Sequence, residues 1–295
     1  MDPYAFDAAW EKERDRLRAL EAIFDQATTR RLADLGVGTG WRCLEVGCGG
    51  GGVALWLARR VGATGRVLAT DLDTRFVAGH GQPNLDVQTH DITADAIEHD
   101  SFDLAHARNV LAHLPDRRRA LDRMIGAVRP GGWILVEDTD MGEAMISAQS
   151  RYVHPPEHAS LVQHIYQAAQ AAFTAIGADA SIGPHLAGWL CEAGLEHVGT
   201  EIHGPIAAGG SEFWARGSIE QLADHLVATG VVTAADVRRY LTLAADPAFL
   251  YPTPILVSAW GQRPTGLPEA EPQKRVPSTP VRPAVERNQP AARRP

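Results

Sequence analysis

Short apolar runs alternate with helical apolar spacing between residues 41 and 138. Runs of this kind, bounded by glycine, proline and charged residues, are typical of buried strands. The five expected strands are Arg42–Val46, Arg66–Thr70, Leu85–Thr89, Phe102–Ala107 and Trp133–Glu137. Helical spacing begins near Gly51, Thr74 and Asp116. Because strands that alternate with helices form parallel sheets through right-handed crossovers, the pattern predicts an α/β, doubly wound, Rossmann-like fold.

The segments on either side of this core have helical patterns. In residues 1–40, Asp7 and Thr28 are suited to cap the first turns of two helices, which we expect to form a collar. After the core of residues 41–140, apolar residues repeat at helical spacing over His158–Phe173. Since open α/β sheets bind ligands at the carboxyl ends of their strands, we expect residues 141–194 to form a lid over that edge.

Two more strand-like runs, Glu196–His203 and Pro254–Trp260, follow the lid segment. Helical patterns near Ile219–Ala228 and Ala234–Ala244 separate them, and we expect residues 195–262 to complete the sheet. Residues 263–295 are rich in proline, arginine and alanine. Such a segment cannot bury enough apolar surface to offset the entropy of ordering, so we expect a disordered tail.

The composition narrows the class of partner. The 295 residues are 45% hydrophobic and 22% charged, which is ordinary for a soluble protein. A formal net charge of −8 gives no concentrated basic face, so we expect neither nucleic acid nor an anionic membrane as a partner. The three cysteines lack zinc-like spacing, so no metal site is expected. No apolar stretch reaches the ~18 residues of a membrane span. We expect a cytoplasmic protein, with homodimer formation left open.

A run of four glycines follows the first expected strand and fits two sequence templates. Gly47, Gly49 and Gly52 match G-x-G-x-x-G, which is typical of dinucleotide binding. Glu45 with Gly47, Gly49 and Gly51 matches E-x-G-x-G-x-G, which favours a nucleoside that carries an amino acid. Both templates use glycine because a bare backbone can turn tightly and approach a ligand at a helix N-terminus.

Three carboxylates separate these alternatives. Asp71 closes the second strand, where either kind of cofactor would place a ribose. Glu45 would repel a pyrophosphate at close range but suits an ammonium group. Asp91 follows the third strand, where an adenine amine would lie. Together they favour a cationic ligand over an anionic one.

The chain resembles the class I S-adenosylmethionine-dependent methyltransferases, in the group that includes ubiquinone and menaquinone biosynthesis enzymes and many small-molecule methyltransferases of bacterial secondary metabolism. The resemblance covers about residues 1–262. It is carried by "LEVGCGGGG" at 44–52, "VLATDLD" at 67–73, "HDI" at 90–92, "FDLAHARNVLAHLPD" at 102–116 and "RPGGWILVED" at 129–138. It implies a seven-stranded sheet whose last strand is antiparallel.

The resemblance also implies which residues hold S-adenosylmethionine. The glycine loop and Glu45 would lie by its methionine part, Asp71 and Leu72 by the ribose and adenine, and Asp91 and Ile92 by the adenine edge. The full set is Glu45, Gly47, Gly49, Gly51, Asp71, Leu72, Asp91, Ile92, Ala107 and Arg108. Gly52 departs from the family pattern by extending the glycine run.

The acceptor of the methyl group is expected to be a small molecule, methylated at oxygen, nitrogen or an electron-rich carbon. The reaction needs no metal, and a general base helps only where the acceptor must lose a proton. The candidate catalytic residues are His113, Tyr4 and Glu137, followed by Asp138, His154 and His158. An unperturbed His113 would titrate near ~6.5. Two alternatives stay open, an NAD(P)-dependent oxidoreductase and a non-catalytic cofactor-binding module.

Overall fold

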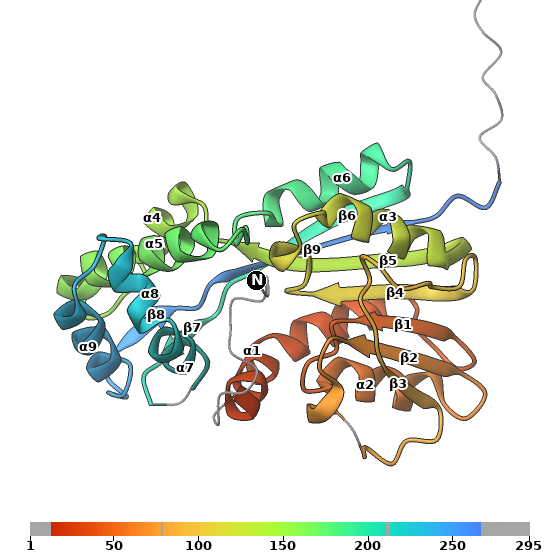
Figure 1. Ribbon diagram of the computed structural model, residues 1–295, viewed down its shortest axis with the longest axis horizontal. Coiled ribbons are helices and arrows are strands. Elements are labelled where there is room, and N and C mark those ends of the chain that lie inside the picture. The colour runs from red at the N-terminus through yellow and green to blue at the C-terminus, as the bar shows by residue number, and fades with distance from the viewer. Residues whose placement is uncertain (1–12, 78, 211–212, 267–295) are drawn as a thin grey trace, which may run out of the picture. The chain divides into compact units, whose positions relative to one another are not determined.

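Seven strands form one mixed sheet in the order β3-β2-β1-β4-β5-β9-β6 (Figure 1). The protein is described by a computed structural model for residues 13–77, 79–210 and 213–266. The strands are β1 Arg42–Val46, β2 Arg66–Asp71, β3 Leu85–Thr89, β4 Phe102–Arg108, β5 Val128–Asp140, β6 Glu196–His203 and β9 Ile255–Gln262. Strands β1 to β5 pair in parallel, and β9 runs antiparallel to both β5 and β6. The predicted fold class, including the antiparallel last strand, is confirmed.

The central strands are apolar because helices cover both faces of the sheet. Leu44 of β1, Ala105 of β4 and Ile134 of β5 are all fully buried. Strand β5 begins five residues before the expected Trp133, at Val128. It can continue through the turn sequence because Gly131 adopts a φ of +79° there, a conformation that favours glycine.

The helices on the core sheet are α1 Glu13–Asp34, α2 Gly52–Val61, α3 Arg117–Ala127 and α6 Leu186–Glu192. Asp116 caps α3 as expected, since its side chain accepts from the backbone N–H of Arg119. Thr28 does not begin a helix. It lies inside the uninterrupted α1 and is fully buried, so the predicted second N-terminal helix is wrong. Thr74 starts only a single 3-10 turn, Thr74–Phe76.

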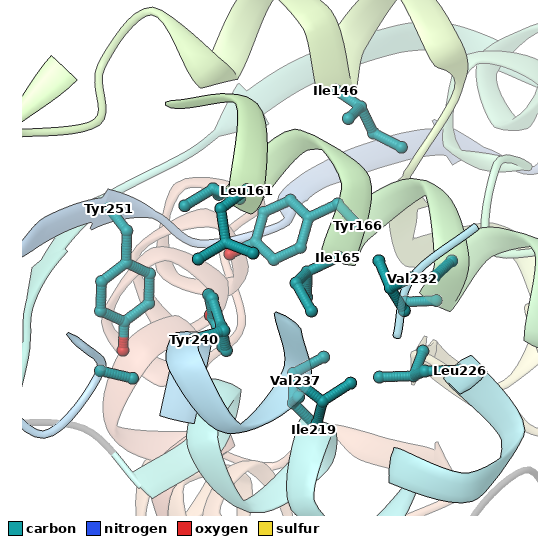
Figure 2. Close-up of a cluster of buried hydrophobic side chains, with 14 of the residues drawn as sticks. Ile146, Leu161, Ile165, Tyr166, Ile219, Leu226, Val232, Val237, Tyr240 and Tyr251 are labelled. Carbon is teal, nitrogen blue, oxygen red and sulfur yellow. The ribbon is translucent and has the colours of Figure 1, made fainter. Parts of the chain in front are cut away.

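A second group of elements forms a cover with its own apolar core. The elements are α4 Glu143–Ser150, α5 Ala159–Ala175, α7 Phe213–Gln221, α8 Ala223–Ala228, α9 Ala234–Leu243, β7 Ile206–Ala208 and β8 Leu250–Pro252. Ile165 of α5, Ile219 of α7 and Val237 of α9 belong to one buried cluster (Figure 2). Helices α7 to α9 therefore pack with the lid segment, whereas of residues 195–262 only β6 and β9 join the large sheet.

The cover lies at the carboxyl ends of the parallel strands, toward which the arrows of β4 and β5 point (Figure 1). Asp7 and the predicted tail beyond Gly266 lie outside the described part of the chain. Arg263, the first residue of that tail, instead donates its backbone N–H to the carbonyl of Gly132. Among the described residues, no helix is long and apolar enough to cross a membrane.

Candidate active site

One cavity of about 480 Å³ lies between the carboxyl edge of the sheet and the cover. It is lined by eight of the ten residues expected to hold the cofactor, namely Glu45, Gly47, Gly49, Asp71, Leu72, Asp91, Ile92 and Arg108. Gly51 and Ala107 are not among the lining residues. Residues from all five motifs of the sequence therefore meet at this cavity.

The glycine loop after β1 depends on missing side chains. A Cβ atom at Gly47, where φ is +69°, would lie 2.2 Å from a methyl carbon of Val110. The backbone N–H of Gly49 donates to Oδ2 of Asp71 over 2.8 Å. Gly51 has a different part in the loop. It caps α2 with a φ of +91° and packs toward Val77, so it shapes the helix start without lining the cavity.

The extra glycine, Gly52, makes room for two acidic residues of α1. A Cβ atom at Gly52 would lie 2.3 Å from Oδ2 of Asp25 and 3.0 Å from the carboxyl carbon of Glu21. The backbone N–H of Gly52 donates to Oε1 of Glu21 over 2.9 Å, so a carboxylate occupies the N-terminus of α2. Burial raises the pKa of Glu21 despite that bond. The glycine run thus continues for a packing reason that local sequence does not reveal.

The part of the cavity beside β2 and β3 is lined by Asp71, Leu72 and Asp91. Oδ2 of Asp71 accepts from Gly49, and its Oδ1 accepts from the N–H of Asp73. Burial raises the pKa of Asp71, while these backbone bonds oppose the rise. The Thr93 side chain lowers the pKa of Asp91. Leu72 is 57% exposed at this wall, an apolar side chain placed to cover a flat base. The residues present therefore fit an adenosine group.

A buried polar network joins Glu45, His106 and Glu137 beneath the cavity. Strand register sets Glu45 beside His106, whose Nδ1 lies 2.7 Å from Oε2 of Glu45. The Nε2 of His106 lies 3.2 Å from Oε2 of Glu137. Burial opposes the imidazolium, but the two carboxylates outweigh it and raise the pKa of His106 to about 9. Sequence reasoning missed His106, although a histidine within an apolar strand signals a buried partner.

This network extends to α1. Glu137 accepts hydrogen bonds from the hydroxyls of Thr28 and Ser258, and it is fully buried. These bonds tie α1 to β5 and β9 of the sheet. The carboxylate of Glu137 does not line the cavity, so it lacks the access to an acceptor that a base would need. Arg108 donates to Thr28 over 2.9 Å and to Oδ1 of Asp25 over 2.7 Å.

The candidate bases separate by position. His113 lines the cavity and its ring is tilted against that of Phe173, with ring centroids 6.0 Å apart. Burial, aided by Arg16, lowers the pKa of His113 to about 4, so the expectation of an unperturbed histidine is wrong. Asp138 also lines the cavity, whereas His154 and His158 do not. Tyr4 lies outside the described residues.

The part of the lining that comes from the cover is largely apolar. It includes Met141, Tyr166, Ala169, Phe173, Ile219 and Leu222. The sequence predicted a helix in this region but not these contacts, because they depend on how distant helices pack. In the described part of the chain, no group of three or more histidine, cysteine, aspartate or glutamate side chains could hold a metal ion.

Comparisons with known proteins agree with this geometry. Residues 9–197 match the model of a family described as a methyltransferase domain. Methyltransferase str2 of Strobilurus tenacellus is 35% identical over 48% of this chain and 51% of its own length. The ubiquinone biosynthesis O-methyltransferase of Paracidovorax citrulli is 34% identical over 32% of this chain and 42% of its own. The chain thus spans about half or less of the length of these relatives.

The fold also has a counterpart among solved structures. A putative methyltransferase from Bacillus halodurans superposes with a TM-score of 0.55 at 16% identity. The match covers 81% of this chain and 100% of that protein. At this identity the likeness concerns the fold.

Proposed function

Since the chain belongs to the methyltransferase-domain family, with S-adenosylmethionine as its cofactor, we propose that it transfers the cofactor's methyl group to a small molecule held in the cavity. The acceptor is a compound of the natural-product kind, methylated at oxygen, nitrogen or an electron-rich carbon. The cofactor leaves as S-adenosylhomocysteine. The position of the cavity beneath the cover supports a small acceptor over a protein or a nucleic acid.

The carboxylate of Glu21, which lies at the N-terminus of α2, is the observation that carries this proposal. Glu21 accepts the N–H of Gly52 at the place where a dinucleotide enzyme binds its pyrophosphate. A carboxylate there repels a phosphate group and attracts the ammonium group of a methionine. This feature argues against an NAD(P)-dependent oxidoreductase. The apolar space beyond the cofactor residues argues against a module that only binds the cofactor, because it leaves room for a second molecule.

The residues divide the work between binding and alignment. The glycine loop, Asp71 and Leu72 would hold the nucleoside and methionine parts, with Asp91 and Ile92 at the adenine edge. When bound, the sulfonium of the cofactor supplies an electrophilic methyl group. Apolar side chains of the cover exclude water and limit how the acceptor can lie, which favours in-line attack. His113 stays a candidate base, present as the neutral imidazole at neutral pH because its pKa is about 4.

Calorimetry with S-adenosylmethionine, S-adenosylhomocysteine and NAD tests the cofactor assignment. We expect the first two to bind and NAD not to bind. The Asp71→Ala variant should bind S-adenosylhomocysteine more than tenfold more weakly, because hydrogen bonds to a charged group contribute about 1.5 to 3 kcal/mol each.

Asp86→Ala is the matched control, since Asp86 is exposed on β3 and does not line the cavity. It should keep the affinity of the unmodified protein. Equal affinities for Asp71→Ala and Asp86→Ala would reject the placement of the ribose, and tight NAD binding would reject the proposed reaction.

A further inference from the structure

Besides one atom each of the half-buried His90 and Asn109, two polar atoms of buried residues in the cavity wall lack a hydrogen-bond partner within the described part of the chain. They are Oδ1 of Asp138, at the end of β5, and Oγ of Ser218, on α7. The two residues are 1% and 5% exposed, and both line the cavity. Buried polar atoms are nearly always paired in folded proteins, because leaving them unpaired is costly. Unpaired groups in a cavity wall therefore indicate that a ligand supplies the partners.

Asp138 and its neighbour Glu137 differ in the partners that their carboxylates have. Glu137, the preceding residue, has its carboxylate paired with His106, Thr28 and Ser258. Asp138 points to the other face of the strand, because successive side chains alternate. The cavity-lining residues that the cover contributes are mostly apolar, and the Tyr166 hydroxyl is already used to donate to the carbonyl of Pro252.

The charges around Asp138 favour an acceptor without a charge. Burial raises the pKa of Asp138 to about 8, and the nearby Glu137 carboxylate adds to the rise. Hydrogen bonds that the Asp138 carboxylate accepts from the backbone N–H groups of Ala112 and Leu111, together with the charge of Arg117 on α3, lower its pKa. His113, on the same turn as Leu111 and Ala112, is neutral at pH 7 because its pKa is about 4.

The other charged residues of the cavity wall are mostly acidic, and its two arginines, Arg16 and Arg108, are each paired with an acid. Glu13 and Arg16 of α1 line the cavity as an ion pair, with Oε1 and Nη2 2.6 Å apart. This pair and the neutral His113 leave no unbalanced positive charge to attract an anionic acceptor. An uncharged molecule that carries a hydrogen-bond donor suits this part of the cavity best.

We propose that Asp138 binds the reacting hydroxyl of an uncharged, largely apolar acceptor and takes its proton. The proposal rests on the proposed methyl transfer and specifies its acceptor as an alcohol or a phenol. As the hydroxyl oxygen bonds to the methyl carbon, the carbon–sulfur bond breaks and leaves its electron pair on sulfur. The hydroxyl proton passes to the carboxylate of Asp138, which is mostly ionised only above about pH 8 and which then releases the proton to water.

Four probes with one apolar body test this assignment by binding alone. They are 2-naphthylmethanol, 2-methylnaphthalene, the cation 2-naphthylmethylammonium and the anion 2-naphthoate, each titrated into protein saturated with S-adenosylhomocysteine. We expect the alcohol to bind about five- to tenfold more tightly than the hydrocarbon. The cation and the anion should bind more weakly than the alcohol. The alcohol's advantage over the hydrocarbon should vanish in Asp138→Ala.

Asp138→Asn keeps the side-chain shape and gives a second readout that does not depend on a probe. The infrared carbonyl band of a buried protonated carboxyl should titrate near pH 8 in the unmodified protein and be absent from Asp138→Asn. Asp140→Asn is the matched control, because Asp140 is buried on the same strand but does not line the cavity. It should keep both the band and the preference for the alcohol.

The inference is overturned if no probe binds, if a charged probe binds most tightly, or if Asp138→Ala retains the preference for the alcohol. It is also overturned if the infrared band persists in Asp138→Asn. These results would leave the proposed function standing as long as S-adenosylhomocysteine binds. Failure of S-adenosylhomocysteine to bind the unmodified protein would instead reject the proposed function itself.

Discussion

At the scale of single residues, neighbouring acids of β5 differ in their partners. The carboxylate of Glu137 is fully paired, whereas Oδ1 of Asp138 lacks a partner in the described part of the chain. His106 lies between the carboxylates of Glu45 and Glu137, and all three are buried. Removing one member of a buried charge network costs more than removing an exposed ion pair, because the partners stay buried without compensation. The network therefore contributes to holding α1 against the sheet, through the bond from Thr28 to Glu137.

The stability contributed by His106 should depend on pH. Its folded-state pKa of about 9 lies above the ordinary value of 6.5, so the charged form favours folding. This contribution is fully present below pH ~6.5 and is lost as the pH rises through about 9. We expect His106→Gln to destabilise the protein by about 3 to 5 kcal/mol at pH 6 and by less at high pH.

Urea unfolding of both proteins between pH 6 and pH 10 measures this difference. Arg118→Gln is a suitable control, because Arg118 pairs with Glu192 at the surface over 3.0 Å. Its cost should stay within about 1 kcal/mol. A cost of His106→Gln that is the same at every pH would contradict the assigned charge state of His106.

At the scale of elements, helix α1 completes the cofactor loop from outside the strand-turn-helix motif. Glu21 reaches the first turn of α2, and Asp25 pairs with Arg108 at the end of β4. The carboxyl groups of Glu21 and Asp25 occupy space that Cβ atoms at Gly50 and Gly52 would otherwise fill. The start of α2 and the collar helix are therefore shaped to each other, and a substitution in one should affect the other.

Gly52→Ala tests this fit against a matched glycine. Alanine normally stabilises a helix by up to about 1 kcal/mol relative to glycine. A Cβ atom at Gly188 of α6 would meet no atom within 4 Å, so Gly188→Ala should be neutral or stabilising. Gly52→Ala should instead lower the melting temperature and weaken S-adenosylhomocysteine binding, because its methyl group displaces Asp25 and Glu21. Equal melting temperatures and equal affinities for S-adenosylhomocysteine in the two variants would show that α1 accommodates the added methyl group without loss of stability.

At the scale of the whole molecule, the cavity exists because two separate chain segments form the cover. Met141 to Ala180 supplies one part of its lining, and Ser218, Ile219, Leu222 and Pro254 supply the other. The last segment returns through β9 to the sheet, where β9 lies between β5 and the edge strand β6. The proposed cofactor residues and the proposed acceptor wall are thus parts of one folded unit.

The composition of the segment after Gly266 predicts that it adds little to this unit. It is rich in proline, arginine and alanine and poor in large apolar residues. A protein that ends at Gly266 should melt within about 1 °C of the full chain, since so little apolar surface is available to bury. It should also bind S-adenosylhomocysteine equally well. A loss of several degrees in a thermal melt would show that the segment contributes to folding.

Much of the fold follows from local sequence. Strands β1, β3 and β6 have the expected bounds, because strands and their turns leave a short-range pattern of apolar residues and glycines. The same holds for most of the cofactor site, whose residues follow directly after the strands. Gly47 and Gly49 are needed wherever a strand turns tightly into a helix, whatever the rest of the chain does.

Tertiary structure decided what depends on distant partners. The helical pattern around Thr28 does not show that its hydroxyl bonds Glu137, so a helix start was expected inside α1. Nothing local distinguishes Glu137, which is paired and withdrawn from the cavity, from Asp138, which lines it. The reason is physical: burial and pairing, which set the pKa and access of a carboxylate, arise from residues far away in the chain. The sequence by itself determined the sheet and the glycine loop, and tertiary packing determined which side chains line the rest of the cavity.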